Sequence, residues 1–210
     1  MNIILCITIT IVLLIIYILS THRFDHFAIT NAKPLISSVD GRLYKVHPQH
    51  THSDRAANIL AKLNEKIVDL LKWLKNKHKN DKITQRLLER YNPDNLIENS
   101  PKDPSNDTAY SLNKGSKIAI CLREKSINED ELLSMSILLF VTFHEMAHIG
   151  IDAINHPPEF WSAFKYLLYE ASVANIYHSP NFANSAVEYC GIKVDYNPLF
   201  DTSVKQYTPT

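Results

Sequence analysis

Apolar residues recur every three or four positions in two long stretches of the chain, and each stretch predicts an amphipathic helix. The first helix is expected over Asp54 to Lys77, capped by Ser53 or Asp54. The second is expected from Glu159 to about Ile176. A shorter helix is predicted over Ile83 to Arg90, ending near Asn92-Pro93 because a residue that precedes proline disfavours helical backbone.

A denser apolar run, Leu132 to Phe143, predicts a buried helix from about Glu129 to Ile149. Asn128 is placed to cap it, and residues 129–131 put acidic groups in its first turn, where the helix dipole favours them. Ahead of it, Tyr110 to Leu112 and Ile118 to Leu122 flank a turn containing Gly115, which predicts a β-hairpin.

The remaining segments are more polar and predict less regular structure. Ile36 to Val46 can hold a short strand or an extended arm, and Val187 to Val194 can be extended. Asn92 to Asp107 is rich in Asn, Asp, Ser and Pro and is expected to be a loop. Helices combined with a small sheet or hairpin predict an α+β fold.

At the amino terminus, Ile3 to Leu19 is an almost unbroken apolar run, close to the shortest length that spans a bilayer. A cleavable signal peptide is the alternative, but Met1-Asn2 lacks a basic side chain and no good cleavage site follows. We therefore expect an uncleaved single transmembrane helix. The basic residues that follow it place the rest of the chain on the cytoplasmic side, or inside a virion membrane.

These patterns divide the chain into four expected parts. Residues 1–22 form the anchor, 23–53 a linker or extended arm, 54–200 the folded domain and 201–210 a tail.

Composition narrows the range of functions. The chain has 210 residues with 22 basic and 22 acidic side chains, and this balance argues against a general nucleic-acid binder. Only 4 glycines occur, without a Gly-rich phosphate-binding pattern. The three cysteines, Cys6, Cys121 and Cys190, have no CxxC spacing, so we expect reduced, buried thiols, with a Cys121–Cys190 disulfide as the alternative.

The strongest chemical signal is His144-Glu145-Met146-Ala147-His148, an HExxH sequence at the end of the predicted buried helix. Residues four apart lie on one face of a helix, so the two imidazoles can close on one zinc ion. Glu145 can then take a proton from water held at the metal. Two histidines that merely pack on an amphipathic helix are the competing interpretation. Burying this set without a metal would be costly.

A catalytic zinc usually keeps three protein ligands. The favoured third ligand is His156, eight residues after His148 and directly before Pro157-Pro158, where a loop can return it to the metal. Glu170 on the next predicted helix is the main alternative. Glu159 is a weaker one, because its place in a first helical turn already accounts for its charge.

HExxH followed by His156-Pro157-Pro158-Glu159-Phe160-Trp161 resembles the HExxH…HxxxFW signature of the WLM, SprT-like and YgjP-like zincin metallopeptidases. The gap between the second and third histidines is longer than in the YgjP-like group. The anchor, the hairpin segment and Tyr189-Cys190-Gly191-Ile192 also look like WLM-like metallopeptidases of large DNA viruses. The resemblance spans roughly Tyr110 to Pro198 and implies that His156 is the third zinc ligand.

The resemblance implies a membrane-anchored, zinc-dependent endopeptidase with a zincin-like fold. A protein or peptide would be its substrate and Glu145 its general base. It also implies that Ile118 to Leu122 binds the peptide as an added strand. Tyr177 or Tyr189 would stabilise the oxyanion. The alternative is a zinc-binding structural or virion membrane protein of this fold without proteolytic activity.

Overall fold

The computed structural model describes residues 9–14, 32–48, 50–99, 108–124 and 131–209. The chain divides into two units, residues 1–32 and 33–210. In the first unit, residues 9–14 are helical with exposed side chains. The predicted span Ile3–Leu19 otherwise lies outside the described residues. Within the described ranges, no helix combines the length and apolar character needed to cross a membrane.

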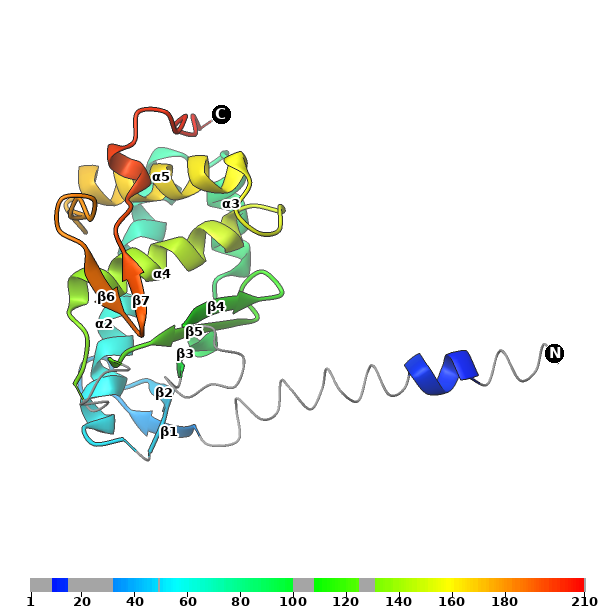
Figure 1. Cartoon of the computed structure of the whole chain (residues 1–210), viewed down its shortest axis with the longest axis vertical. Coiled ribbons are helices and arrows are strands. Elements are labelled where there is room, and N and C mark those ends of the chain that lie inside the picture. The colour runs from blue at the N-terminus through cyan, green and yellow to red at the C-terminus, as the bar shows by residue number, and fades with distance from the viewer. Residues whose placement is uncertain (1–8, 15–31, 49, 100–107, 125–130, 210) are drawn as a thin grey trace. The chain divides into compact units, whose positions relative to one another are not determined.

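The second unit is built around a five-stranded mixed sheet (Figure 1). Its strand order is β1-β2-β3-β5-β4; β1 with β2 and β4 with β5 are antiparallel, whereas β2 with β3 and β3 with β5 are parallel. A second, two-stranded antiparallel sheet joins β6 and β7. The strands are β1 Lys33–Ile36, β2 Leu43–Val46, β3 Leu96–Asn99, β4 Ala109–Leu112, β5 Lys117–Cys121, β6 Val187–Tyr189 and β7 Ile192–Val194.

Helices α2 Ser53–Lys77, α3 Lys82–Arg90, α4 Met135–Gly150 and α5 Pro158–Val173 pack with this sheet, and 3-10 turns occur at Pro93–Asn95 and Pro198–Phe200. α2 packs on β1, β2 and β3, whereas α4 packs on β4 and β5. Figure 1 shows α4 between the sheet and α5. Together with the strands, these helices confirm the predicted α+β class.

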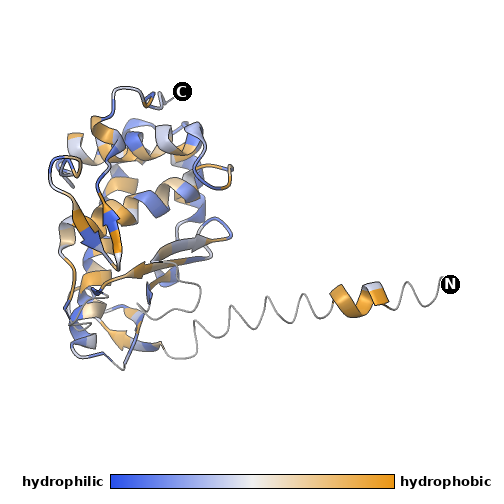
Figure 2. Cartoon of the chain, viewed as in Figure 1, coloured by the Kyte–Doolittle hydropathy of each residue, from blue (hydrophilic) through white to orange (hydrophobic). Residues whose placement is uncertain are grey.

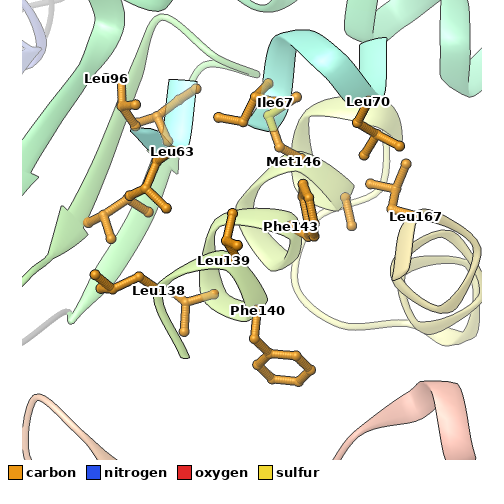
Figure 3. Packing of buried hydrophobic residues seen from close by; sticks show 14 of the residues in the cluster. Leu63, Ile67, Leu70, Leu96, Leu138, Leu139, Phe140, Phe143, Met146 and Leu167 are labelled. Atoms are coloured by element: carbon orange, nitrogen blue, oxygen red, sulfur yellow. The ribbon is translucent and has the colours of Figure 1, made fainter. Parts of the chain in front are cut away.

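α4 is the central element of the core because its side chains are buried in nearly every direction. Leu138, Leu139, Phe140, Phe143 and Met146 pack together with residues of α2 and α5 (Figure 3). A helix that is apolar all round is stable only when its neighbours cover it completely. Figure 2 shows that hydrophilic residues interrupt this apolar helix toward its carboxyl end. The polar residues of the candidate site are therefore embedded in the core.

The start of α4 differs from the prediction. The helix begins at Met135, after Ser134, rather than near Glu129. Leu132 instead forms a bridge with Arg123, and the Leu133 amide donates to the Leu122 carbonyl at 2.9 Å. Pairing with the end of β5 keeps this segment extended. The expected cap Asn128 lies outside the described residues.

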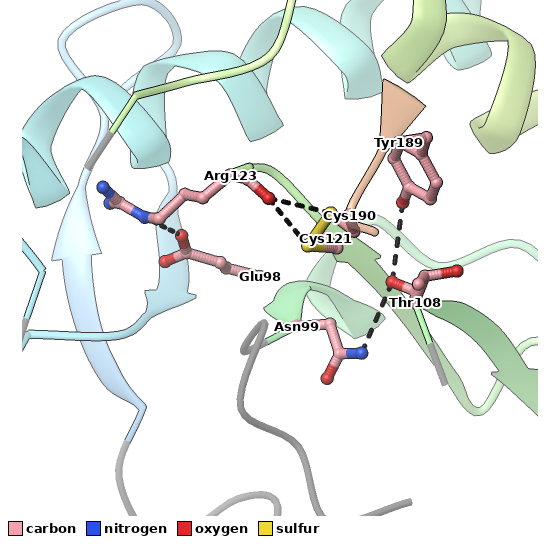
Figure 4. Close-up of a disulfide and its surroundings, with 7 residues drawn as sticks. All are labelled: Glu98, Asn99, Thr108, Cys121, Arg123, Tyr189 and Cys190. Atoms are coloured by element: carbon pink, nitrogen blue, oxygen red, sulfur yellow. Dashed lines mark hydrogen bonds and ion pairs between the residues drawn. A yellow bond between two sulfur atoms is a disulfide. The ribbon is translucent and has the colours of Figure 1, made fainter. Parts of the chain in front are cut away.

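The loop predicted over Asn92 to Asp107 contains β3, which lies in the middle of the sheet, so that prediction was wrong for Leu96–Asn99. Glu98 is buried there because Arg123 Nε donates to its Oε1 at 2.7 Å (Figure 4). The His47 amide donates to its Oε2 at 2.8 Å. A buried carboxylate needs such partners. They come from distant parts of the chain.

The expectation of reduced cysteines was also wrong. Cys121 at the end of β5 and Cys190 form a disulfide (Figure 4). Cys190 and Gly191 both have positive φ, 48° and 82°, and make the tight turn between β6 and β7. A two-residue type I′ hairpin turn needs positive φ at both central residues. The disulfide connects this turn to the end of β5 in the main sheet.

The compact unit begins at Lys33 rather than at residue 54, because β1 and β2 belong to the main sheet. The expected tail also packs on the domain. Tyr207 donates to Asp81 Oδ1 at 2.5 Å, and Lys165 Nζ donates to the carbonyl oxygens of Asp201 and Val204.

The disulfide predicts a large effect on stability. It closes a loop with a sequence separation of 69, for which chain entropy gives about 4 kcal/mol. Cys190→Ser should lower the free energy of unfolding in urea by a few kcal/mol. The double variant with Cys121→Ser should lose no more than the single one. Equal unfolding midpoints for wild type and Cys190→Ser would show that the bond does not stabilise the fold.

Candidate metal centre

Helix α4 places His144 and His148 on the same face, one turn apart, as the HExxH spacing predicted. Their ring centroids are 5.0 Å apart. The apolar residues of α4 are packed in the core, so the backbone that carries the two imidazoles is held in place. Both side chains are partly buried.

His156 comes back to this pair from the loop between α4 and α5. Asn155 has a φ of 62°, which turns the chain directly before His156. The His156 Nε2 atom lies 3.0 Å from His144 Nε2 and 3.1 Å from His148 Nε2. Potential ligand atoms of all three histidines lie within 4.8 Å of one another.

These two contacts of His156 Nε2 fit a metal site better than a hydrogen-bonded cluster. An imidazole Nε2 carries either one proton or one lone pair, both in the ring plane, so it can make only one good hydrogen bond. His156 Nε2 faces two nitrogens at hydrogen-bond distance. In tetrahedral zinc sites with Zn–N near 2.0–2.1 Å, the ligand nitrogens are about 3.3 Å apart. The two distances from His156 Nε2, 3.0 and 3.1 Å, lie within a few tenths of an ångström of that value.

The electrostatics also favour neutral imidazoles. Burial, followed by the neighbouring histidines, lowers the pKa of His144 to about 3. Burial, His156 and Lys114 lower the pKa of His148 to about 4, and burial lowers the pKa of His156. Neutral rings have the lone pair that a cation requires.

Phe160 and Trp161 of α5 pack against the histidines. Phe160 is fully buried, and its ring centroid lies 4.7, 4.3 and 4.5 Å from those of His144, His148 and His156. Trp161 packs on His156 with a centroid distance of 5.6 Å. One aromatic ring thus touches all three imidazoles.

Glu145 and the three histidines line one cavity of about 730 Å³. Glu145, between the two histidines on α4, is only 4% exposed and is among the residues that line this cavity. The opposite wall comes from the β4–β5 hairpin and the loop before His156. The remaining lining residues are Ala109, Tyr110, Ser111, Asn113, Lys114, Ala153, Ile154 and Asn155.

Glu170, the alternative third ligand, lies in a separate polar cluster. Its carboxylate accepts hydrogen bonds from Trp73 Nε1 at 2.7 Å and Lys77 Nζ at 3.1 Å and contacts His78. Burial raises the pKa of Glu170, but these bonds outweigh it and leave the pKa below its usual value. Glu159 sits in the first turn of α5. Neither glutamate lines the cavity.

The two candidate oxyanion tyrosines are held elsewhere. Tyr177 donates to the Ser136 carbonyl at 2.8 Å, and the Tyr189 hydroxyl lies 3.5 Å from the Thr108 carbonyl. Burial, followed by the charge of Glu145, raises the pKa of Tyr189. The charge of Glu145 thus acts on the Tyr189 hydroxyl. Neither tyrosine is among the residues that line the cavity.

The strand expected to bind a peptide is also different. β5, which holds most of Ile118–Leu122, lies between β3 and β4 and has both edges paired. β4 is the outer strand of the described sheet, and Ala109, Tyr110 and Ser111 line the cavity. Sequence reasoning also missed Lys114, because its place in the hairpin turn was predicted but its contacts with the distant carbonyls of His148 and Ala153 were not.

Comparisons with known proteins give distant matches. No family model matches the chain. It is 26% identical over 152 residues to the uncharacterized protein R325 of Acanthamoeba polyphaga mimivirus, which covers 70% of this chain and 75% of that protein. It is 33% identical over 69 residues to the uncharacterized protein 136R of invertebrate iridescent virus 6, covering 33% and 38% respectively. Both relatives are viral proteins.

Among solved structures, the chain is similar to Wss1 from Saccharomyces cerevisiae, with 22% identity and a TM-score of 0.47 over 62% of this chain and 87% of that chain. A Wss1 mutant gives the same TM-score with 21% identity.

The geometry predicts which residue completes the metal site. His156→Ala should weaken zinc binding by at least about tenfold, because it removes one of three converging nitrogens. Glu170→Gln keeps the side-chain shape and should bind zinc like wild type. Competition with a chromophoric chelator measures both. Zinc loss in Glu170→Gln with normal binding in His156→Ala would reverse the assignment.

Proposed function

We propose that this chain is a zinc-dependent peptidase, with His144, His148 and His156 as metal ligands and Glu145 as general base. The observation that carries the proposal is the position of His156 Nε2, 3.0 Å from His144 Nε2 and 3.1 Å from His148 Nε2, in the cavity that Glu145 also lines. The sequence resemblance to WLM and SprT-like zincins supports the same reaction class. Hydrolysis of a peptide bond is the chemistry that this set of groups performs.

Zinc, when bound, would polarise the scissile carbonyl and lower the pKa of a water molecule to about 7. The chain's own contribution to proton transfer is Glu145. Its carboxylate takes a proton from the attacking water and later delivers it to the leaving amine, so that the base is regenerated. Glu145 is only 4% exposed, so its carboxylate has little contact with bulk solvent.

The outer edge of β4 is suited to holding an extended peptide. The Cys121 amide donates to the Thr108 carbonyl at 3.0 Å, which makes this a hydrogen-bonded pair. Pairs alternate along antiparallel strands, so the backbone groups of Ala109 and Ser111 point away from β5. A substrate strand pairing there would run along the cavity toward the histidines.

A membrane location is part of the proposal and rests on the apolar run Ile3–Leu19. Disulfides are rare in the cytosol. The Cys121–Cys190 bond therefore favours the virion membrane over the cytoplasmic face of a host membrane.

Glu145→Gln separates a peptidase from a zinc-binding protein without activity. We expect the variant to keep about one zinc per chain and to lose roughly 100- to 10,000-fold in kcat, the usual contribution of a general base. Peptide-library cleavage by the whole chain, together with metal analysis, measures both. Glu159→Gln, an exposed residue of α5, is the matched control. Unchanged cleavage by Glu145→Gln would remove Glu145 from the mechanism.

The edge strand makes a separate prediction. Ser111→Pro removes an outward-pointing amide while leaving the bonds between β4 and β5 in place. It should raise KM by up to about tenfold, the value of one lost hydrogen bond, with little change in kcat. Ser111→Ala keeps the amide and should behave like wild type. If both variants had the wild-type KM, substrate would bind elsewhere.

A further inference from the structure

Three basic side chains converge on the carboxyl end of α4. Arg90 Nη1 donates to the Ile149 carbonyl at 2.9 Å, and Arg86 reaches the Gly150 carbonyl at 3.5 Å. Lys114, from the turn between β4 and β5, donates through Nζ to the His148 carbonyl at 3.2 Å. Three consecutive carbonyls at the helix end therefore each face a cation.

These cations satisfy the carbonyl groups that are left unpaired at the end of a helix. The last carbonyls of a helix have no partner within it, and they form the negative end of its dipole. Ile151, the residue after α4, is extended, with φ −117° and ψ 162°, rather than left-handed. The chain thus leaves α4 directly into the loop that carries His156, and side chains satisfy the carbonyls.

The same cations also hold that loop. Arg90 donates to Asp152 Oδ1 at 2.9 Å, and Arg86 pairs with the other oxygen of Asp152. Asp152 is 62% exposed, so each of these ion pairs contributes little by itself. Lys114 donates to the Ala153 carbonyl at 2.8 Å, and this contact is to the backbone, three residues before His156.

Lys114 differs from the two arginines because it also lines the cavity. Its ammonium group joins the backbone of one zinc ligand, His148, to the loop that delivers another, His156. Seven residues lie between these histidines, and after α4 ends at Gly150 they form a loop in which Ile154 is 80% exposed. A fixed point within that loop limits where the third imidazole can lie.

We propose that Lys114 is a positioning residue of the metal centre: by bridging the carbonyls of His148 and Ala153 it holds His156 at the spacing that zinc requires. The inference rests on the proposed zinc site. Lys114 does not touch the metal or the substrate in this role, and it acts through the loop backbone. Residues that orient ligands in this way typically change metal affinity when they are replaced.

The test is zinc affinity of the whole chain, measured by chelator competition for wild type, Lys114→Met, Lys114→Arg and Lys62→Met. Methionine keeps an unbranched side chain at a position with φ 56° but cannot donate. Lys62 is exposed on α2 and is the matched control. The zinc Kd of Lys114→Met should rise about 10- to 100-fold. The zinc Kd of Lys114→Arg should lie between those of Lys114→Met and wild type. The zinc Kd of Lys62→Met should equal that of wild type.

Thermal melting of the metal-free proteins accompanies the titration, because a purely structural lysine would lower the melting temperature without changing zinc affinity. A wild-type Kd in a folded Lys114→Met variant overturns the inference and leaves the proposed function intact. If Lys114→Met fails to fold, the comparison of Lys114→Arg with wild type decides, and equal affinities overturn the inference. A wild-type chain that binds no zinc overturns both.

Discussion

The His156 Nε2 atom, held about 3 Å from the Nε2 atoms of both His144 and His148, is the constraint on which the rest of the site depends. Such a cluster is unfavourable alone, because its lone pairs face one another and burial removes the water that would separate them. The protein maintains it by rigidity. Two rings stand on α4, whose apolar sides are covered on every side by the core, and Phe160 packs against all three rings. A cation converts this arrangement from a cost into a stabilising interaction.

The edge strand β4 is the part of the main sheet that lines the cavity. β4 lies beside the cavity with the backbone groups of Ala109 and Ser111 directed outward, while its turn supplies Lys114 to the loop that carries His156. At the opposite end of the hairpin, the Cys121–Cys190 bond fastens the turn between β6 and β7 and keeps Tyr189 near Glu145. The short β4–β5 hairpin therefore connects the strand beside the cavity, the lysine that contacts the His156 loop, and the disulfide.

Local patterns in the sequence predicted the elements that carry the chemistry. These patterns involve residues that are close together in the sequence. They are the periodicity of α2, the apolar run of α4, the hairpin around Gly115, and the HExxH and HxxxFW spacing. Features set by distant contacts could not be predicted. β3 looked like a loop because its polar Glu98 and Asn99 are buried only by partners such as Arg123. The same holds for the disulfide, for the later start of α4 and for Lys114, whose role depends on two carbonyls 34 and 39 residues away.

The coordination of the metal is the most direct test of the central claim. Zinc K-edge X-ray absorption of the purified whole chain reports the number, type and distance of the ligands. Three imidazoles and one further light atom at about 2.0–2.1 Å are expected for a three-histidine catalytic site. Sulfur ligands near 2.3 Å, fewer than three imidazoles, or the absence of stoichiometric zinc would contradict it.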